Sequence, residues 1–280
     1  MNRLKRYFPF FVLPTLIAFV IAFAIPFVLG IYLSFTEFTT VTDAEFVGLQ
    51  NYITVFTESN GFLRSLLFTV AFTVVTVVSV NIIAFALALL LSKNLPGTNA
   101  FRTVFFLPNL IGGIVLGYIW QLIINGVLIK YGNTITADPK FGFWGLVILT
   151  NWQLIGYMMT IYIAGLMAVP QDQIEAARVD GASSGRILLN ITIPSVMPSI
   201  TICTFLVLTN SFKLFDQNLA LTAGAPARKT EMLALDIYNT FYGRMGYEGV
   251  GQAKAVVFFI IVAAVALLQL YFTSRKEQEA

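Results

Sequence analysis

Charged residues are absent from six long stretches of the chain, and this pattern sets the first expectation about its fold. Each stretch contains the roughly 20 residues that a helix needs to cross the hydrocarbon core of a bilayer. A charge there would cost about 2.5–3.5 kcal/mol on insertion scales. The pattern predicts an all-α integral membrane protein with one transmembrane domain over residues 1–280. We expect membrane helices at about 9–36, 65–92, 103–125, 143–168, 193–213 and 255–274.

The composition agrees with the membrane class. The chain is 58% hydrophobic and 11% charged, with a mean hydropathy of +0.81, whereas an ordinary soluble domain has about 25% charged residues. A water-soluble fold could not cover its surface with so few polar groups. The net charge of +3 is small and spread along the chain, so we expect no nucleic-acid partner.

Several chemistries are excluded by residues that the sequence lacks. Histidine is absent and Cys203 is the sole cysteine, so there is no imidazole base, internal disulfide or multi-cysteine metal site. The phosphate-binding pattern Gly-x-x-x-x-Gly-Lys-Ser/Thr is also absent. We therefore expect no enzyme activity, no metal and no nucleotide cofactor in this chain.

The residues around the first predicted span indicate the orientation. Arg3, Lys5 and Arg6 precede it and acidic residues follow it, which places the N-terminus in the cytoplasm. An even number of spans returns the C-terminus to the same side. The apolar run is about twice the length of a signal-peptide core, so we interpret it as a retained anchor. This orientation puts five basic residues in the last outer loop: Lys213, Arg228, Lys229, Arg244 and Lys254.

The segment 169–194, between the fourth and fifth predicted spans, contains a short helix pattern. Pro170 suits the start of a helix, and Gly181 suits the left-handed residue that ends one. We expect a helix from about Gln171 to Asp180 and a second one from Ser183 to Asn190. An amphipathic loop helix without a partner is the alternative interpretation.

This segment resembles the "EAA" loop of the permeases of binding-protein-dependent ABC importers. The resemblance is carried by Glu175-Ala176-Ala177, then Asp180-Gly181-Ala182, then Ile193-Pro194. It implies a coupling helix that sits in a groove of a cytoplasmic ATPase, with Glu175 pairing with a basic group. It also implies two copies of that ATPase, which bind ATP and magnesium, a second similar permease, an extracytoplasmic binding protein and a location in the bacterial cytoplasmic membrane.

Further motifs are similar to those of the maltose-type carbohydrate permeases. They are Gly48–Tyr52, Arg102 with Leu107-Pro108 and Trp120, and Leu221-Thr222 with Gly224 and Pro226. The segment Ser211–Asn218 resembles permeases of multiple-sugar or raffinose-type systems, which implies an oligosaccharide. We interpret Gly48–Tyr52 as a loop brace. Gly113 and Gly117 are typical of close helix packing.

Polar and aromatic residues within the fourth and fifth spans are candidates for holding a sugar. Polarity suggests Thr150, Gln153, Tyr157, Asn210 and Ser211, and the family resemblance implies Leu154, Leu214 and all of these except Gln153. The alternative for each is an interhelical hydrogen bond, worth about 0.6 kcal/mol on average. The candidates are Thr150, Gln153, Leu154, Tyr157, Asn210, Ser211 and Leu214. Only Tyr157 keeps the family's residue, so we expect the sugar to be held differently from maltose.

Together these features predict a permease subunit that moves a sugar by alternating access, driven by separate ATPase subunits. The main alternative is a secondary carrier or channel that is not driven by ATP. Proton-coupled carriers usually need ionisable groups midway through the membrane. The predicted spans contain none, which argues against this alternative.

Overall fold

The computed structural model describes residues 2–40, 42–57, 61–93 and 96–278. Its contacts divide the chain into two compact units. Unit 1 comprises Met1–Phe62 and Asp236–Ile260, and unit 2 comprises Leu63–Leu235 and Ile261–Ala280. Helices α13 and α14 each have residues in both units. The prediction of a single transmembrane domain therefore stays a prediction.

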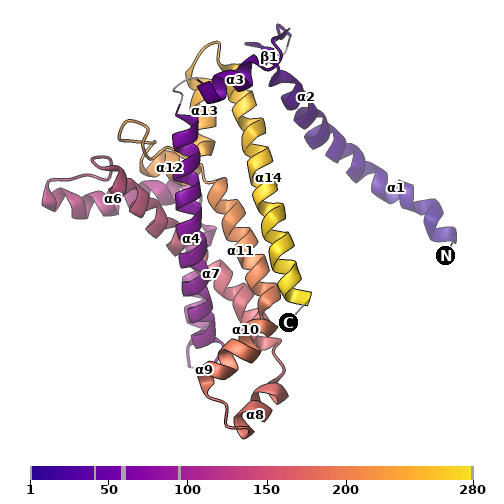
Figure 1. Cartoon of the computed structure of the whole chain (residues 1–280), viewed down its shortest axis with the longest axis vertical. Helices are drawn as coiled ribbons and strands as arrows, with labels where there is room; N and C mark the ends of the chain where they lie inside the picture. Colours follow the sequence, from indigo (N-terminus) through magenta and orange to yellow (C-terminus); the bar gives the residue numbers. More distant parts are fainter. Residues whose placement is uncertain (1, 41, 58–60, 94–95, 279–280) are drawn as a thin grey trace. The chain divides into compact units, whose positions relative to one another are not determined.

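The described chain is mostly helical (Figure 1). The long helices are α4 (Phe62–Leu91), α6 (Gly113–Leu128), α7 (Pro139–Met167), α11 (Met197–Phe212) and α14 (Glu248–Gln278). The others are α1 (Asn2–Phe19), α2 (Ile25–Leu33), α3 (Gln50–Thr57), α5 (Thr98–Phe106), α8 (Gln171–Val179), α9 (Ser184–Ile187), α10 (Ile193–Ser195), α12 (Asp216–Leu221) and α13 (Leu233–Gly243). Strands β1 (Thr36–Glu37) and β2 (Glu45–Phe46) pair antiparallel, with Thr36 opposite Phe46.

Within the described residues, five helices are long and apolar enough to cross a membrane, and a bent pair makes six if it is one span. Four of them match predicted spans closely: Phe10–Leu33, Phe62–Leu91, Pro139–Met167 and Glu248–Thr273. The first contains a π-helical turn at Val20–Ala24, just before Pro26, which cannot donate a backbone hydrogen bond.

The third predicted span, 103–125, is wrong as a continuous helix. Helix α5 ends at Phe106, a 3-10 turn follows at Leu107–Leu110, and α6 begins only at Gly113. Ile111 has extended backbone angles between them. Pro108 lacks a backbone donor and Gly112 favours no helix, so the chain breaks here.

The fifth predicted span, 193–213, is also interrupted. The segment Ser184–Ser195 and helix α11 are inclined by 69° to each other. Pro198 in the first turn of α11 has no N–H for the carbonyl of Pro194, and its ring disfavours a straight helix through this point. The straight part of the span therefore begins at Met197.

In unit 1, the Gly48–Tyr52 motif braces the hairpin, as the sequence predicted. The Asn51 side-chain amide donates to the carbonyls of Ser34 at 3.0 Å and Thr36 at 2.8 Å. The Tyr52 hydroxyl lies 2.6 Å from the Ser34 hydroxyl. Gly48 has a φ of +62°, which glycine adopts without strain.

The Asp43 carboxylate closes the turn that joins the two strands. It accepts hydrogen bonds from the Thr39 hydroxyl and from the backbone N–H groups of Thr39 and Thr40. These bonds favour the charged form and lower the pKa of Asp43 to about 2, the Thr39 hydroxyl having the largest effect.

Unit 1 also contains a buried ion pair that the sequence analysis did not predict. The Lys254 ammonium donates to the Asp236 carboxylate and to the Thr240 hydroxyl, each at 2.8 Å, and all three side chains are buried. Lys254 lies within α14, not in an outer loop, because this helix begins at Glu248. The prediction that no span contains a charged residue is therefore wrong for Lys254, and Arg64, Lys130, Lys140 and Glu248 also lie close to the ends of candidate spans.

The core of unit 2 forms where α4, α7 and α11 meet. It contains small residues of α4, such as Ala84 and Ala88, together with Met158 and Tyr162 of α7 and Cys203 of α11. Small side chains allow membrane helices to approach closely. The Tyr162 hydroxyl donates to the Asn81 side chain at 2.5 Å and so joins α7 to α4.

Helix α5 contacts α7 through a glycine. A Cβ atom added at Gly156 would lie 1.8 Å from the backbone oxygen of Phe105, so no larger residue fits there without displacing α5. In the middle of α5, Arg102 joins this helix to α4, because its guanidinium donates to the Leu91 carbonyl at 2.8 Å. A cation at a helix C-terminus is favourable.

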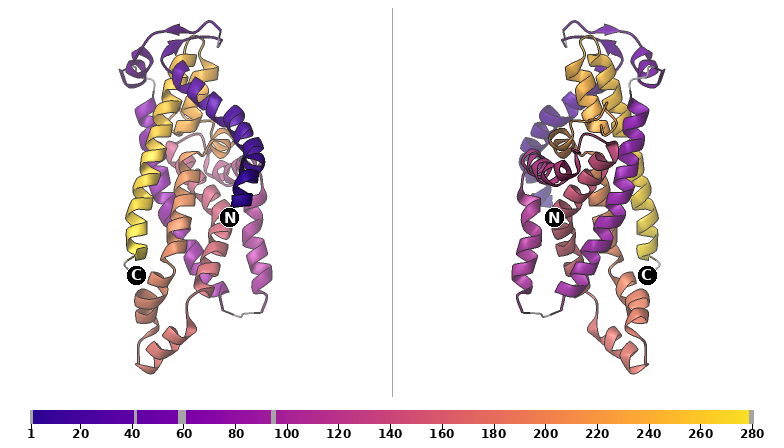
Figure 2. Two further views of the ribbon diagram at one scale, coloured as in Figure 1. Left: turned by 90° about the vertical axis from the view of Figure 1, so that its right-hand side faces the viewer. Right: turned by 90° about the vertical axis from the view of Figure 1, so that its left-hand side faces the viewer.

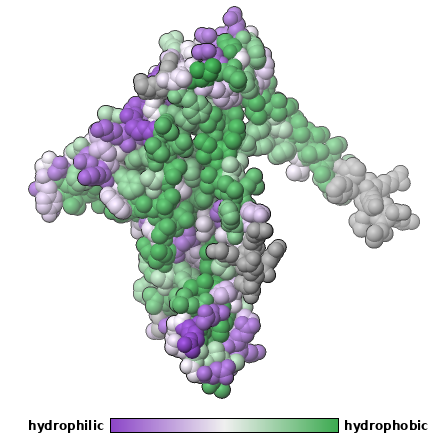
Figure 3. Space-filling model, viewed as in Figure 1, coloured by the Kyte–Doolittle hydropathy of each residue, from purple (hydrophilic) through white to green (hydrophobic). Residues whose placement is uncertain are grey.

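Helix α8 lies at one end of unit 2, in both the front and the side views (Figures 1 and 2). Hydrophilic residues gather at this end of the surface, while hydrophobic residues cover the visible face of the long helix α4 (Figure 3). This distribution is expected when lipid surrounds the long helices and water surrounds the helix end.

We expect Lys254→Met or Asp236→Leu alone to lower the free energy of unfolding by about 3–5 kcal/mol, because each leaves one buried charge without its partner. The double variant should lose much less, since both charges are gone. Thermal unfolding of the purified protein in detergent measures this, with Lys229→Met as the exposed-lysine control. A double variant that loses the sum of the two single effects would contradict the pairing.

Candidate functional site

Helix α7 presents four of the predicted site residues on one face. Thr150, Gln153, Leu154 and Tyr157 follow the spacing that aligns side chains along a helix. Thr150 and Leu154 are 1% and 7% exposed. The face therefore lies inside unit 2 rather than on its surface.

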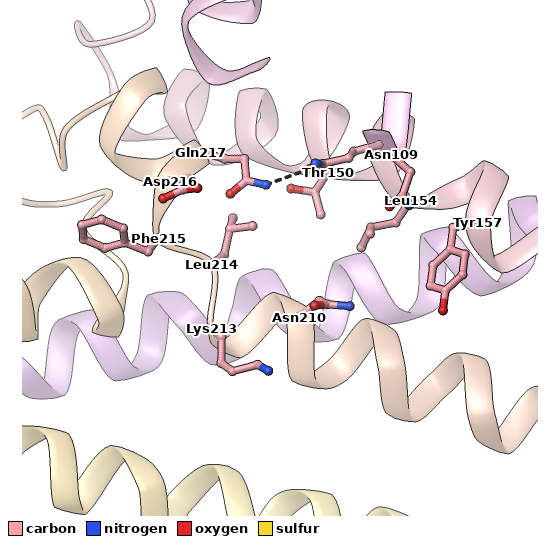
Figure 4. A pocket seen from close by; sticks show the side chains of 11 residues that line it. Asn109, Thr150, Leu154, Tyr157, Asn210, Lys213, Leu214, Phe215, Asp216 and Gln217 are labelled. Atoms are coloured by element: carbon pink, nitrogen blue, oxygen red, sulfur yellow. Dashed lines mark hydrogen bonds between the residues drawn. The ribbon is translucent and has the colours of Figure 1, made fainter. Parts of the chain in front are cut away.

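Helix α11 and the segment after it contribute the remaining candidates. Asn210 lies in the last turn of α11 and Leu214 follows its end at Lys213. Asn210 is exposed and Leu214 is buried. Asn210 and Leu214 lie on the side of unit 2 where α7 presents its four residues (Figure 4).

Six of the seven predicted residues line a single cavity of about 450 Å³ (Figure 4). This volume falls within the roughly 300–1,000 Å³ typical of small-molecule sites. Five further residues line the same cavity and were not predicted as site residues. The complete lining is Asn109, Thr150, Gln153, Leu154, Tyr157, Asn210, Lys213, Leu214, Phe215, Asp216 and Gln217.

Ser211 is the candidate that the structure does not bring to the cavity. Its side chain is fully buried, and its hydroxyl has no hydrogen-bond partner within the described part of the chain. Successive helix positions are rotated by about 100°, so Asn210 and Ser211 cannot both face the cavity. The prediction of Ser211 as a cavity residue is corrected to an inward-packed position.

The cavity lining is polar but electrically balanced. Lys213 and Asp216 contribute one positive and one negative charge, and both are exposed. Deeper in the cavity, the Gln217 amide donates to the Gln153 side-chain oxygen at 2.8 Å. The site therefore offers amide and hydroxyl groups rather than a net charge.

The Thr150 hydroxyl is a buried group with unused hydrogen-bonding capacity. Thr150 is 1% exposed and lines the cavity, and its Oγ1 atom has no partner among the described residues. Leaving such a group unsatisfied costs about 1–3 kcal/mol. A ligand hydroxyl that reaches this position would satisfy it.

The unpredicted residues of the cavity come mainly from α12 and the turn before α6. Asp216 and Gln217 begin α12, and Asn109 belongs to the 3-10 turn that interrupts the third predicted span. The sequence signal that could have pointed to α12 was the Gly113–Gly117 pair, because these two glycines pack against α12. A Cβ atom at Gly117 would lie 2.7 Å from the Cβ of Ala220. Sequence spacing alone did not identify that partner.

The second predicted site, on α8, has the helix bounds that the sequence suggested. Helix α8 runs from Gln171 to Val179, and Gly181 follows with a φ of +76°. The N–H of Gly181 donates to the Arg178 carbonyl at 3.1 Å, and the N–H of Ala182 donates to the Ala177 carbonyl at 2.9 Å. This is the Schellman arrangement that ends a helix at a left-handed glycine.

The surface of α8 is open to a partner. Glu175 and Ala176 are exposed, Ala177 is half-buried, and the apolar Val179 is 88% exposed. A groove of about 300 Å³ separates α8 from the segment that follows it. It is lined by Ala177, Asp180, Ala182, Arg186, Ile187, Asn190 and Ile191.

Ile193 and Pro194, the last members of the predicted loop motif, lie apart from α8. They form the short helix α10 immediately before the bend at Val196. The motif therefore spans two structural features, the helix α8 and the bend that leads into α11.

The chain belongs to the family of binding-protein-dependent transport system inner membrane components, whose model matches residues 82–278. The sequence is 42% identical to the probable starch degradation products transport system permease protein AmyD of Thermoanaerobacterium thermosulfurigenes, over 96% of this chain and 94% of the relative. It is 29% identical to the multiple sugar-binding transport system permease protein MsmF of Streptococcus mutans, over 95% of each chain.

Solved structures support the fold. A chain from a bacterial ABC transporter involved in the import of the acidic polysaccharide alginate superposes with a TM-score of 0.82, covering 98% of each chain at 19% identity. A methionine ABC transporter chain superposes with a TM-score of 0.56 over 77% of this chain, also at 19% identity. The fold is thus that of ABC importer permeases.

We expect Thr150→Val to raise the free energy of unfolding by roughly 1 kcal/mol in the absence of cargo, because it removes an unsatisfied buried hydroxyl. Thr160→Val is the matched control on the same helix, since the Thr160 hydroxyl donates to the Tyr157 carbonyl at 2.6 Å. Thermal unfolding in detergent compares the two. Equal destabilisation by both substitutions would show that Thr150 has a partner.

Proposed function

We propose that this chain is one of two permease subunits of an ATP-driven importer and that its cargo is a neutral sugar, an oligosaccharide in particular. The observation that carries the proposal is the convergence of Thr150, Gln153, Leu154, Tyr157, Asn210 and Leu214 on one cavity. These six side chains, predicted from the sequence to bind a sugar, come from α7, from α11 and from the segment that follows α11. Their meeting at one place is expected of a cargo site.

The chemistry of the cavity suits a sugar. Asn109, Gln153, Asn210 and Gln217 have amides that can both donate and accept hydrogen bonds, as sugar hydroxyl groups do. The ring of Tyr157 offers an apolar face against which a sugar ring can stack. The printed names of AmyD and MsmF, which refer to starch degradation products and multiple sugars, support the same class of cargo.

Helix α8 is the proposed contact with the motor. We propose that it enters a groove of a cytoplasmic ATPase, with Glu175 facing a basic group and Val179 entering an apolar pocket. The exposure of both side chains supports this role. Two ATPase copies would bind ATP and magnesium, a second permease would complete the pathway, and an extracytoplasmic binding protein would deliver the sugar.

The proposed topology places both termini and α8 in the cytoplasm. The basic residues Arg3, Lys5 and Arg6 before the first span support it. With this orientation the motor and α8 share one side of the membrane, as ATP-driven coupling requires.

One observation favours the alternative function of a secondary carrier. A charged pair links Lys254, in the long apolar helix α14, to Asp236 in α13. However, the two groups neutralise each other at 2.8 Å, and the Lys254 ammonium also donates to the Thr240 hydroxyl. The cavity-lining helix α11 has no charged residue, and α7 has Lys140 only in its first turn. Family membership and these features favour the importer.

The test of the proposed function is reconstitution of the chain with its partner permease and ATPase in proteoliposomes. We expect a binding protein loaded with a neutral oligosaccharide to stimulate ATP hydrolysis and uptake of that sugar. A panel of neutral sugars, a sugar phosphate and an acidic polysaccharide fragment identifies the cargo. Sugar uptake that continues without the ATPase subunits would refute the proposal.

The proposed role of α8 predicts that Glu175→Lys and Gly181→Pro each reduce ATP-driven uptake to background while the protein still inserts in the membrane. The first reverses a charge at the contact. The second places proline, whose φ is fixed near −65°, where the backbone requires +76°.

Gln173→Lys is the control for this prediction. Gln173 is exposed on α8, about half a turn from Glu175, so it adds a positive charge on another face. Uptake and co-purification of the ATPase are measured for each variant. Normal values in both Glu175→Lys and Gly181→Pro would rule out α8 as the contact.

A further inference from the structure

Helix α12 provides a wall of the cavity that neither membrane helix supplies. Asp216 and Gln217, at its start, line the cavity together with Lys213 and Phe215 just before it. In Figure 4 these side chains lie on the side opposite Leu154 and Tyr157, with Asn210 and Thr150 between the two groups. The cavity thus extends from α7 and α11 to α12.

Gln217 is held in place from behind by α6. A Cβ atom at Gly113 would lie 2.7 Å from the Cβ of Asp216 and 3.1 Å from the amide nitrogen of Gln217. At the far end of α12, the Gln121 amide donates to the Leu221 carbonyl at 2.9 Å. These contacts with α6 set the position of α12 and direct the Gln217 side chain toward α7.

The Gln217–Gln153 pair leaves hydrogen-bonding capacity unused. The Gln217 amide nitrogen donates to the Gln153 side-chain oxygen at 2.8 Å, and within the described chain this is the one side-chain hydrogen bond of Gln217. The Gln153 nitrogen reaches the Ile111 carbonyl only at 3.5 Å, the outer limit of a hydrogen bond. Both amides can therefore exchange this arrangement for bonds to a ligand.

A second polar group points to a ligand at the same place. The unpartnered Thr150 hydroxyl, 1% exposed, lines the cavity one helical turn from Gln153. Hydroxyls and amides together match the donor and acceptor pattern of a sugar better than that of an anion. The opposite charges of Lys213 and Asp216 at the edge leave no net charge to attract an anionic cargo.

We propose that Gln217 binds the cargo directly and determines specificity, and that its bond to Gln153 opens so that both amides bond to hydroxyl groups of the sugar. This inference rests on the proposed function and extends its binding site onto α12. It makes α12, held on Gly113 of α6, a cargo-recognition element outside the long membrane helices.

The experiment measures uptake kinetics in proteoliposomes that contain the complete importer. Gln217→Ala removes the amide, and Gln217→Glu keeps the side-chain length but removes the N–H donors. We expect KM for the preferred neutral sugar to rise about tenfold in each variant, because a loss of one to two hydrogen bonds weakens binding by about that factor. The maximal rate should change little, and the order of preference within the sugar panel should change.

Gln50→Ala is the matched control, because Gln50 is an exposed glutamine in α3 of unit 1. It should leave KM and preference unchanged. Gln217→Glu is close to isosteric, so it provides the measurement if Gln217→Ala does not assemble.

Each outcome decides between the two proposals. No uptake of any sugar by the unmodified complex overturns the proposed function and this inference with it. Normal uptake with an unchanged KM in both Gln217 variants overturns the inference alone. A lower maximal rate for all sugars, with KM and preference unchanged, shows that Gln217 has only a structural role and also overturns it.

Discussion

Helix α7 packs closely against α5 and α11 and contacts α4 through side chains, and much of unit 2 is arranged around it. Gly156 lets the backbone of α5 approach α7, and Tyr162 joins α7 to Asn81 of α4. The face of α7 that carries Thr150 and Gln153 lines the cavity, and Leu154 on the same face also belongs to this core. In a membrane, such packing and interhelical hydrogen bonds must hold helices together, because lipid removes the hydrophobic drive for their association.

The cavity and helix α8 are connected on both sides of α8: α7 ends at Met167 just before it, and one bend leads from it into α11. Val196 and Ser199 lie at this bend and pack on Gly165 of α7, where an added Cβ would lie 2.3 Å from the Ser199 hydroxyl oxygen. The chain passes from α8 through α10 and this bend into α11, which ends near Asn210. In the proposed cycle, a displacement of α8 reaches the cavity along this path, and the cavity responds only if its contacts differ between the two states.

The buried Lys254–Asp236 pair shows how charge can enter an apolar segment. An isolated charge would be too costly there, but a partner at 2.8 Å and the Thr240 hydroxyl satisfy the ammonium group. Lys254 is the seventh residue of α14 and Asp236 lies in α13, so the charge-free stretch 255–274 begins later than the helix does. Helices extend beyond their apolar segments wherever charged groups find partners.

The sequence alone determined the membrane class, the α8 helix and its glycine stop, and the face of α7 that carries Thr150, Gln153, Leu154 and Tyr157. The membrane class and the α8 helix depend on the cost of charge in lipid and on proline and glycine geometry, which a single segment reveals. The residues on the face of α7 followed from their polarity and from the family resemblance. Tertiary structure decided which segments meet. It turned Ser211 inward and brought α12 with Gln217 into contact with Gln153 of α7. Those outcomes depend on packing between residues far apart in the chain, such as Gly113 against Gln217, and no local pattern specifies the partner of a packed surface.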